Sequence, residues 1–380
     1  MKASSAMLGI YIHIPFCAGK CPYCGFNSRP ADASVIECYL AALHEEIVLR
    51  SQADVAADTV YFGGGTPTIL PASRLADILR GVLTRFRAVV GAEVTVEANP
   101  ESLTREALAE LREAGFNRLS IGAQSFDDDV LAALGRRHDA TRAIEAVGDA
   151  RATGWSNISL DLIFGVPGQS PGQWKATLKR AISLRPEHIS TYCLTVEPET
   201  EFERRKQAGE IEGVGEDAEL EMYVAARLML CAAGYEHYEI SNFALPGKRC
   251  RHNEKYWRGG EYFGLGAGAH SRAAGVRWAN AAQAQEYIAM LAQGTLPVTY
   301  AERLCARRAL EEELILALRT GEGVCLRELG LRCGRDAVSE YRNQVRELAA
   351  AGLAVAEGSR VILTDRGLAL ANEVAIRVMA

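Results

Sequence analysis

The feature that most limits how this chain can fold is a strand–loop–helix unit that recurs between residues 9 and 194. Short runs of β-branched and apolar residues predict six strands, at 9–14, 59–62, 93–97, 118–121, 159–164 and 188–194. Helical patterns of about 10–15 residues separate these runs, which indicates a parallel sheet with right-handed crossovers. Because no dinucleotide-binding glycine fingerprint is present, we expect an α/β protein built on an open, partial (β/α)6 barrel.

The segment after residue 235 is harder to interpret. It contains R-H-N-E-K-Y-W from Arg251 and Y-F-G-L-G-A-G-A-H-S from Tyr262, which are rich in aromatic residues and glycine. Neither stretch shows a helical or strand period, so we predict an irregular extension of the barrel.

The last eighty residues change character. Helices near 304–318 and 336–350, a short helix near 326–329 and an apolar hairpin at 353–363 predict a small winged-helix-like α+β domain. Acidic residues and arginines are equally numerous there, so we do not expect DNA binding. The predicted domains are residues 1–235, 236–300 and 301–380.

Composition excludes several classes of protein. The 380 residues are 48% hydrophobic and 24% charged, with a net charge of −6, which does not favour nucleic acid or an anionic membrane as a partner. No apolar run reaches the length of a membrane span. Ten cysteines without a recognisable secretory cleavage site favour reduced thiols, so we expect a cytoplasmic protein.

Three of those cysteines form a motif. Cys17, Cys21 and Cys24 have the spacing C-x3-C-x2-C and follow H-I-P-F at the end of the first predicted strand. Thiolates bind zinc and iron–sulfur clusters. A closed zinc site needs four ligands, so zinc would require a remote residue such as Cys38 or His44. Three thiolates can instead hold three irons of a four-iron cubane and leave the fourth iron open.

This motif resembles the cluster loop of radical S-adenosylmethionine (SAM) enzymes. The resemblance implies a [4Fe–4S] cluster at the three cysteines, with SAM bound to the open iron through its amino and carboxylate groups. It also implies an electron donor, because in that family an electron from the reduced cluster cleaves SAM and releases a 5′-deoxyadenosyl radical.

The loops after the predicted strands supply further candidates. Gly63 to Thr66 read G-G-G-T, where glycines allow close approach to a ligand and can offer N–H groups to a carboxylate. Polar residues that could bind ribose, adenine or a carboxylate stand in or near later loops, although each could equally be a solvated loop residue or a salt-bridge partner. These residues are Glu97, Gln124, Arg136 and Asp161.

A narrower resemblance covers about residues 9 to 375. The chain is similar to the oxygen-independent coproporphyrinogen III oxidase branch, whose SAM-site pattern is matched by Tyr11, Cys17, Cys21, Cys24, Gly64, Gly65, Thr66, Glu97, Gln124, Arg136 and Asp161. Two departures stand out. Phe26 occupies the place of the oxidase's fourth cysteine, and the segment before the first cysteine is shorter than the corresponding segment of the oxidase.

These departures, together with H-N-E-K-Y-W at 252–257 and G-A-G-A-H-S at 266–271, resemble HemW-type heme chaperones. The resemblance implies a protein that binds heme and passes it to an acceptor protein, with membrane contact only through that acceptor. The alternative is a radical SAM oxidoreductase that decarboxylates coproporphyrinogen III in porphyrin biosynthesis. We expect no such activity here.

His252 is the predicted heme contact. An imidazole can bind heme iron, and Tyr256 and Trp257 could pack against the flat macrocycle. The alternative is a loop histidine whose ring nitrogens are satisfied by hydrogen bonds.

Overall fold

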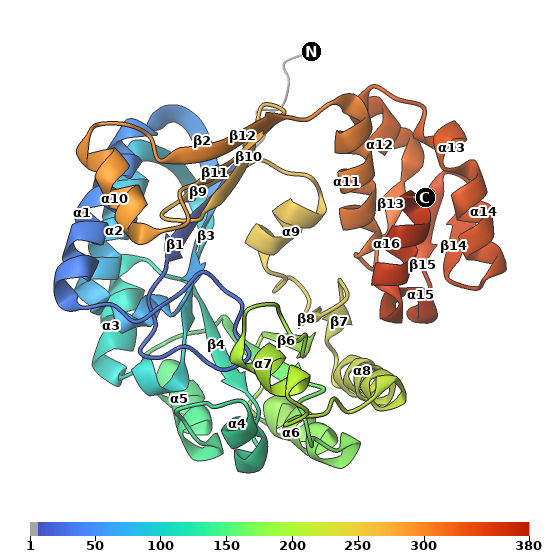
Figure 1. Ribbon diagram of the computed structural model, residues 1–380, viewed down its shortest axis with the longest axis horizontal. Helices are drawn as coiled ribbons and strands as arrows, with labels where there is room; N and C mark the ends of the chain where they lie inside the picture. The colour runs from blue at the N-terminus through green and yellow to red at the C-terminus, as the bar shows by residue number, and fades with distance from the viewer. Residues whose placement is uncertain (1–6, 380) are drawn as a thin grey trace.

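The computed structural model describes residues 7–379, so residues 1–6 of the first predicted domain lie outside the described part. The described residues form a 12-stranded mixed sheet and a separate three-stranded sheet (Figure 1). The order of the large sheet is β12-β11-β10-β9-β1-β2-β3-β4-β5-β6-β8-β7.

The first half of the chain builds the parallel part of this sheet. Neighbouring strands from β1 to β6 pair in parallel. The strands are β1 (Leu8–Ile14), β2 (Gln52–Gly64), β3 (Phe86–Ala98), β4 (Arg118–Gln124), β5 (Ile158–Phe164) and β6 (His188–Cys193). Both faces of β1 and β5 are largely buried, as expected for strands covered by helices on one side and by the barrel interior on the other.

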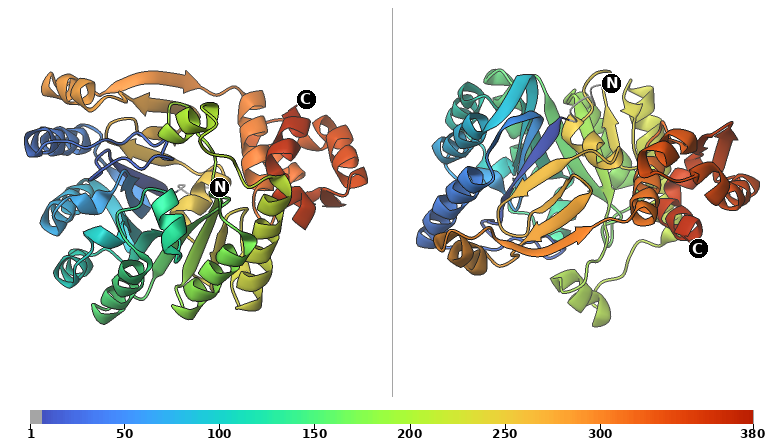
Figure 2. Two further views of the ribbon diagram at one scale, coloured as in Figure 1. Left: turned by 60° about the horizontal axis from the view of Figure 1, so that its bottom comes forward. Right: turned by 90° about the horizontal axis from the view of Figure 1, so that it is seen from above.

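Helices cover the outer face of the curved sheet, where they fan out side by side (Figure 2). They are α1 (Ala33–Leu49), α2 (Ala72–Arg85), α3 (Arg105–Ala114), α4 (Asp128–Ala133), α5 (Ala140–Ala152) and α6 (Pro171–Ser183). Local sequence fixes several helix ends. Thr104 caps α3 by accepting from the N–H of Ala107, and Ser170 forms a capping box with Gln173 at the start of α6.

The second half of the chain extends both edges of the same sheet. Beyond α7 (Glu201–Gln207) and α8 (Glu216–Ala232), β7 (Glu236–His237) and β8 (Asn242–Ala244) join the β6 edge. The chain then returns to the other edge, where β9 (Tyr262–Leu265) pairs in parallel with β1. An antiparallel ribbon completes that edge and consists of β10 (His270–Ala273), β11 (Val276–Asn280) and β12 (Val298–Arg303). Helix α10 (Ala284–Ala292) connects β11 to β12 in the sequence.

The prediction that residues 251–271 are irregular was wrong. Arg251–Trp257 form helix α9, and the segment after it forms β9, the following turn and the start of β10. Seven residues make only two turns, which is too short for a periodic pattern to be recognised in the sequence. Tertiary contacts fix this helix instead.

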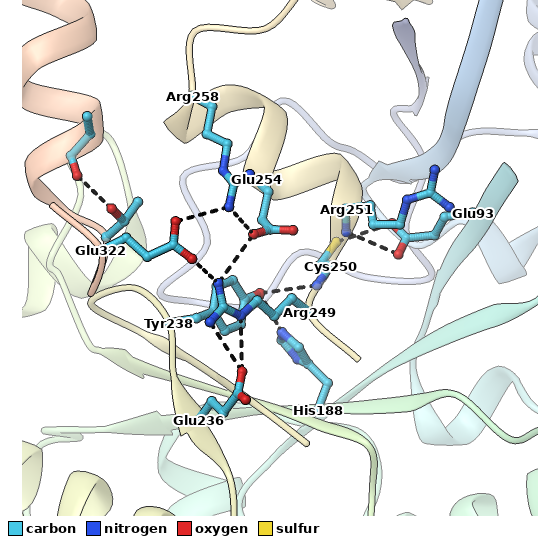
Figure 3. Close-up of polar contacts among 12 residues, drawn as sticks. Glu93, His188, Glu236, Tyr238, Arg249, Cys250, Arg251, Glu254, Arg258 and Glu322 are labelled. Atoms are coloured by element: carbon cyan, nitrogen blue, oxygen red, sulfur yellow. Dashed lines mark hydrogen bonds and ion pairs between the residues drawn. The ribbon is translucent and has the colours of Figure 1, made fainter. Parts of the chain in front are cut away.

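Helix α9 lies inside the curve of the sheet, near the amino ends of the barrel strands (Figure 1). Glu93 on β3 anchors its first turn, because its two carboxylate oxygens accept from the backbone N–H of Arg251 and of His252, each at 3.1 Å (Figure 3). A carboxylate at a helix N-terminus satisfies donors that have no partner within the helix.

Arg249, just before α9, connects three parts of the chain. Its guanidinium pairs with Glu236 at 3.2 Å and with Glu322 at 2.6 Å, and it lies over the ring of Tyr238 (Figure 3). Glu322 belongs to the C-terminal domain and also pairs with Arg258. These contacts fasten the C-terminal domain to the segment that carries α9.

The C-terminal domain has its own core, from Leu310 to Val378, around the sheet order β13-β15-β14. Its elements are α11 (Ala306–Leu318), β13 (Val324–Cys325), α12 (Leu326–Cys333), α13 (Ala337–Glu340), α14 (Arg342–Ala350), β14 (Ala354–Glu357), β15 (Arg360–Leu363), α15 (Asp365–Ala369) and α16 (Ala371–Met379). The predicted fold class, a partial barrel followed by a small α+β domain, is therefore confirmed.

The division into domains 1–235, 236–300 and 301–380 stays a prediction. One hydrophobic core runs from Leu8 to Leu291 and so includes residues of the first two predicted domains, and the boundary at residue 301 falls within β12. Within residues 7–379, no helix combines the length and apolar character needed to cross a bilayer.

Candidate functional site

A cavity of about 370 Å³ opens where the barrel strands end at their carboxyl side. The structure brings most of the predicted site residues together around it. They are Cys17, Cys21, Cys24, Gly64, Gly65, Thr66, Glu97, Gln124, Arg136 and Asp161. Two predicted residues, Tyr11 and His252, do not line this cavity.

The cysteine loop forms one side of the cavity and is held by backbone hydrogen bonds at its start and in its middle. The N–H of Cys17 donates to the carbonyl of Arg29 at 3.2 Å, and the carbonyl of Pro22 accepts from Phe202 at 3.0 Å. All three cysteines of the loop are free thiols. The loop therefore presents three soft donors to one space.

This donor set fits a multi-iron cluster better than a single zinc ion. Among the described residues, no three His, Cys, Asp or Glu side chains lie close enough together to hold one metal ion. The remote ligands that zinc would need are also absent from the cavity, since neither Cys38 nor His44 lines it. A cubane places each thiolate on a different iron, which suits three thiols around a shared space.

The Gly64–Thr66 loop passes directly beside the cysteine loop. A Cβ atom at Gly65 would lie 2.4 Å from the carbonyl oxygen of Phe16 and 3.0 Å from Cys17 Sγ, so only glycine fits there. The N–H groups of Gly65 and Thr66 donate to the carbonyls of Ile14 and Phe16, each at 2.8 Å. The N–H groups of Gly65 and Thr66 are therefore used within the β1–β2 connection, and the binding of SAM by this loop stays a prediction.

Two carboxyl groups lie deeper among the barrel strands. Glu97 Oε1 accepts from the Tyr61 hydroxyl at 2.7 Å, and burial raises the pKa of Glu97 to about 7. Asp161 Oδ2 accepts from the Ser120 hydroxyl at 3.0 Å, and burial raises the pKa of Asp161 as well. Partly dehydrated carboxylates of this kind bind hydroxyl or ammonium groups strongly, because such a ligand replaces missing water.

Arg136 joins the cysteine loop to the strand ends. Its Nη1 donates to Cys21 Sγ at 3.5 Å, and its Nη2 donates to Asn99 Oδ1 at 2.6 Å and to the carbonyl of Gly122 at 3.1 Å. Nε of the same guanidinium is buried without a hydrogen-bond partner. Nearby, Gln124 has a φ of 61°, a strained conformation of the kind that clusters at functional sites.

Tyr11 and His252 lie inside the barrel, away from the cavity. The ring of Tyr11 stacks on Tyr61, and its hydroxyl is 3.1 Å from Nδ1 of His13. His252 is 1% exposed, and its two ring nitrogens lie 2.8 Å from the hydroxyls of Thr59 and Tyr256. The heme contact predicted for His252 stays a prediction. The contacts of the ring do not support it, because heme iron could reach the imidazole only if α9 moved out of the barrel.

The structure adds residues that the sequence did not single out. Asn99 Nδ2 donates to Thr66 Oγ1 at 2.9 Å and so connects the glycine loop to Arg136. Tyr192 and Cys193 also line the cavity, at the end of β6. Their position near the carboxyl end of the sixth predicted strand was the available signal, because the carboxyl ends of the barrel strands meet at the same opening.

Two family models match the chain. A model of the radical SAM superfamily matches residues 11–181, and a model of the HemN C-terminal domain matches residues 305–370. Among solved structures, the fold is similar to that of coproporphyrinogen III oxidase (HemN) from Escherichia coli, a radical SAM enzyme. The TM-score is 0.87 at 23% identity, covering 98% of this chain and 90% of that one.

Curated relatives match at higher identity. The chain is 38% identical to heme chaperone HemW of Bacillus subtilis, covering 97% of this chain and 98% of that protein. It is also 38% identical to heme chaperone HemW of Mycobacterium tuberculosis, covering 96% of this chain and 93% of that protein. With matches of this length on a radical SAM fold, the chain belongs to the HemW heme chaperone family of the radical SAM superfamily.

Proposed function

We propose that this protein binds heme and passes it to an acceptor protein. The observation that carries the proposal is the similarity to proteins named heme chaperones, which extends over nearly the whole chain, including the C-terminal domain. Heme here is cargo and not a resident cofactor. We also propose that the protein acts in the cytoplasm, because its ten cysteines are all free thiols.

The proposed resident cofactors are a [4Fe–4S] cluster and SAM. Cys17, Cys21 and Cys24 would hold the cluster, and SAM would bind beside it. When bound, the cluster and SAM together can supply one-electron chemistry. Because this chemistry needs an electron, we also propose an electron-donor protein as a partner.

The side chains around the cavity have the chemistry that SAM requires. Glu97 and Asp161 can accept from ribose hydroxyls or the ammonium group, Arg136 can pair with the carboxylate, and Gln124 can bind the adenine. The cavity-lining position of these residues supports this assignment. Tyr11 contributes indirectly at most, by packing against the strand that carries Gly64.

The proposed function is tested by adding hemin to the anaerobically reconstituted protein and recording the absorption spectrum. We expect a Soret band that transfers to apomyoglobin when this heme-free acceptor is added in excess. Supplying coproporphyrinogen III, SAM and a reductant should yield no protoporphyrinogen, because Phe26 replaces the cysteine that the oxidase pattern carries. Turnover of coproporphyrinogen III would contradict the chaperone function.

A further inference from the structure

Asn99, the first residue after β3, makes a hydrogen bond on each side of its amide. Its Oδ1 accepts from Nη2 of Arg136 at 2.6 Å, and its Nδ2 donates to Oγ1 of Thr66 at 2.9 Å. The orientation of the amide follows from its partners, because a guanidinium can only donate and therefore faces the oxygen. Asn99 thus connects two side chains that reach the cavity from different loops.

Both of these side chains contact a cysteine of the loop. Nη1 of Arg136 lies 3.5 Å from Sγ of Cys21, and Oγ1 of Thr66 lies 3.5 Å from Sγ of Cys17. The Thr66 oxygen already accepts from Asn99, so its hydrogen is left for Cys17, its one other hydrogen-bond partner among the described residues. A cysteine that binds iron is a thiolate and can only accept. Asn99 therefore orients two donors toward two sulfurs.

The backbone fixes Asn99 in this position. Its carbonyl accepts from the N–H of Ser102 at 3.0 Å and from the Ser102 hydroxyl at 2.8 Å. Pro100 restricts the residue before it to extended conformations, and Asn99 has a φ of −99° and a ψ of 147°. Arg136 has an anchor of its own, since Nη2 also donates to the carbonyl of Gly122 at 3.1 Å. The amide and the guanidinium thus keep their positions without help from the cysteines.

We propose that Asn99 is a positioning residue that raises the reduction potential of the [4Fe–4S] cluster by orienting the Thr66 hydroxyl and the Arg136 guanidinium toward two of its ligand sulfurs. Reduction adds negative charge to a cluster, and hydrogen-bond donors to the sulfurs stabilise that charge. The inference rests on the cluster proposed at the cysteine loop and adds how the surrounding residues set its potential. A less negative potential makes reduction by the proposed electron donor easier.

The test is a redox titration of the anaerobically reconstituted full chain without SAM, followed by the electron paramagnetic resonance signal of the reduced cluster. We expect Asn99→Ala to shift the midpoint potential to more negative values, because both donors lose the group that orients them. Thr66→Val replaces the hydroxyl by a methyl group of similar size and should give a smaller shift in the same direction. Iron and sulfide contents verify that each variant holds the cluster.

The double variant Asn99→Ala/Thr66→Val tests whether Asn99 acts through Thr66. We expect it to shift the potential by less than the sum of the two single shifts, because both substitutions affect the same hydrogen bond to Cys17. Fully additive shifts would overturn the inference, and so would an unchanged potential in Asn99→Ala.

Asn99→Asp is the second variant in case Asn99→Ala loses the cluster. The aspartate keeps the size of the side chain and an acceptor for Arg136, but it cannot donate to Thr66. Its added charge also lowers the potential. Comparing Asn99→Asp with and without the Thr66→Val substitution cancels that contribution, so the non-additive part still reports the hydrogen bond.

Matched controls remove the same groups outside the cavity. Asn343→Ala on α14 and Thr84→Val on α2 replace exposed residues, and neither should shift the potential. A wild-type protein that retained no iron and sulfide would overturn the proposed cluster and this inference with it. A cluster whose potential is the same in the wild type and the Asn99 variants would overturn the inference alone.

Discussion

The hydroxyl of Tyr256 lies 2.8 Å from Nε2 of His252 and occupies the ring nitrogen that heme iron would otherwise approach. Nδ1 is 2.8 Å from the Thr59 hydroxyl, so the imidazole has partners on both sides. Burial lowers the pKa of His252 to about 3, which keeps the ring neutral. His252 thus holds helix α9 to the barrel interior through its hydrogen bond with Thr59 on β2.

From this geometry, His252→Ala should lower stability without changing heme affinity. Removing the ring leaves two buried hydroxyls without a partner, and we expect the free energy of unfolding to fall by ~2–4 kcal/mol. Urea unfolding and hemin titration measure the two effects separately. His270→Ala is the control, because His270 is exposed at the start of β10. Loss of heme binding at unchanged stability would restore His252 as a ligand.

The cluster prediction concerns the three thiols of the loop. Replacing Cys17, Cys21 or Cys24 by Ala should each abolish the [4Fe–4S] cluster after anaerobic reconstitution, because the loop supplies three thiols and the loss of one leaves an iron without its ligand. Iron and sulfide content and visible absorption provide the measurement. Cys38→Ala should retain the cluster, and its loss in that variant would show that the ligands are assigned incorrectly.

Asp161 offers a test of SAM binding. Asp161→Ala removes a carboxylate that lines the cavity, and the loss of charged hydrogen bonds should weaken SAM binding by about tenfold or more. Equilibrium dialysis with SAM on reconstituted protein gives the affinity. Asp77→Ala, on the exposed surface of α2, should bind SAM like the wild type. Equal affinity in Asp161→Ala would remove this residue from the site.

Glu97 should make the stability of the ligand-free protein depend on pH. Its pKa is about 7 in the folded protein against an ordinary value of 4.5, so the folded state holds the proton more tightly than the unfolded state. The contribution to stability is therefore complete below about pH 4.5 and is lost as the pH rises through 7. Its size is at most about 3 kcal/mol.

The variant Glu97→Gln isolates this effect from other titrating groups. Urea unfolding of both proteins from pH 4 to pH 8 should show the wild type losing stability relative to the variant over that interval. If the difference between their free energies of unfolding stayed constant from pH 4 to pH 8, the pKa of Glu97 would be the same in the folded and unfolded protein.

The sequence predicted the parallel half of the fold because its signals are local. Each strand of that half is a short apolar run followed by a helix, and residues at the strand ends, such as Gly65 and Gln124, do meet around one cavity. Strand limits were less accurate: β2 and β3 each span 13 residues, well beyond the predicted 59–62 and 93–97. Their amino-terminal halves show no apolar alternation from which pairing could have been predicted.

The second half of the large sheet was not predicted, because the residues that fix its strands and helix α9 are distant from them in the sequence. Helix α9 is capped by Glu93, a residue on β3, and β9 is a strand because it lies beside β1. The cysteine spacing, by contrast, singled out a loop that lines the cavity, since all three thiols lie within eight residues.

The pairing of β1 with β9 has a consequence for synthesis of the chain. One edge of β1 is covered by β2, but the other is covered only by a strand that begins at Tyr262. Until the ribosome has released that strand, the first strand of the protein presents unpaired N–H and C=O groups that can associate with other chains. A truncated chain that ends after α8 would keep this edge permanently open, so the parallel barrel alone should aggregate even though each of its strand–helix units is complete.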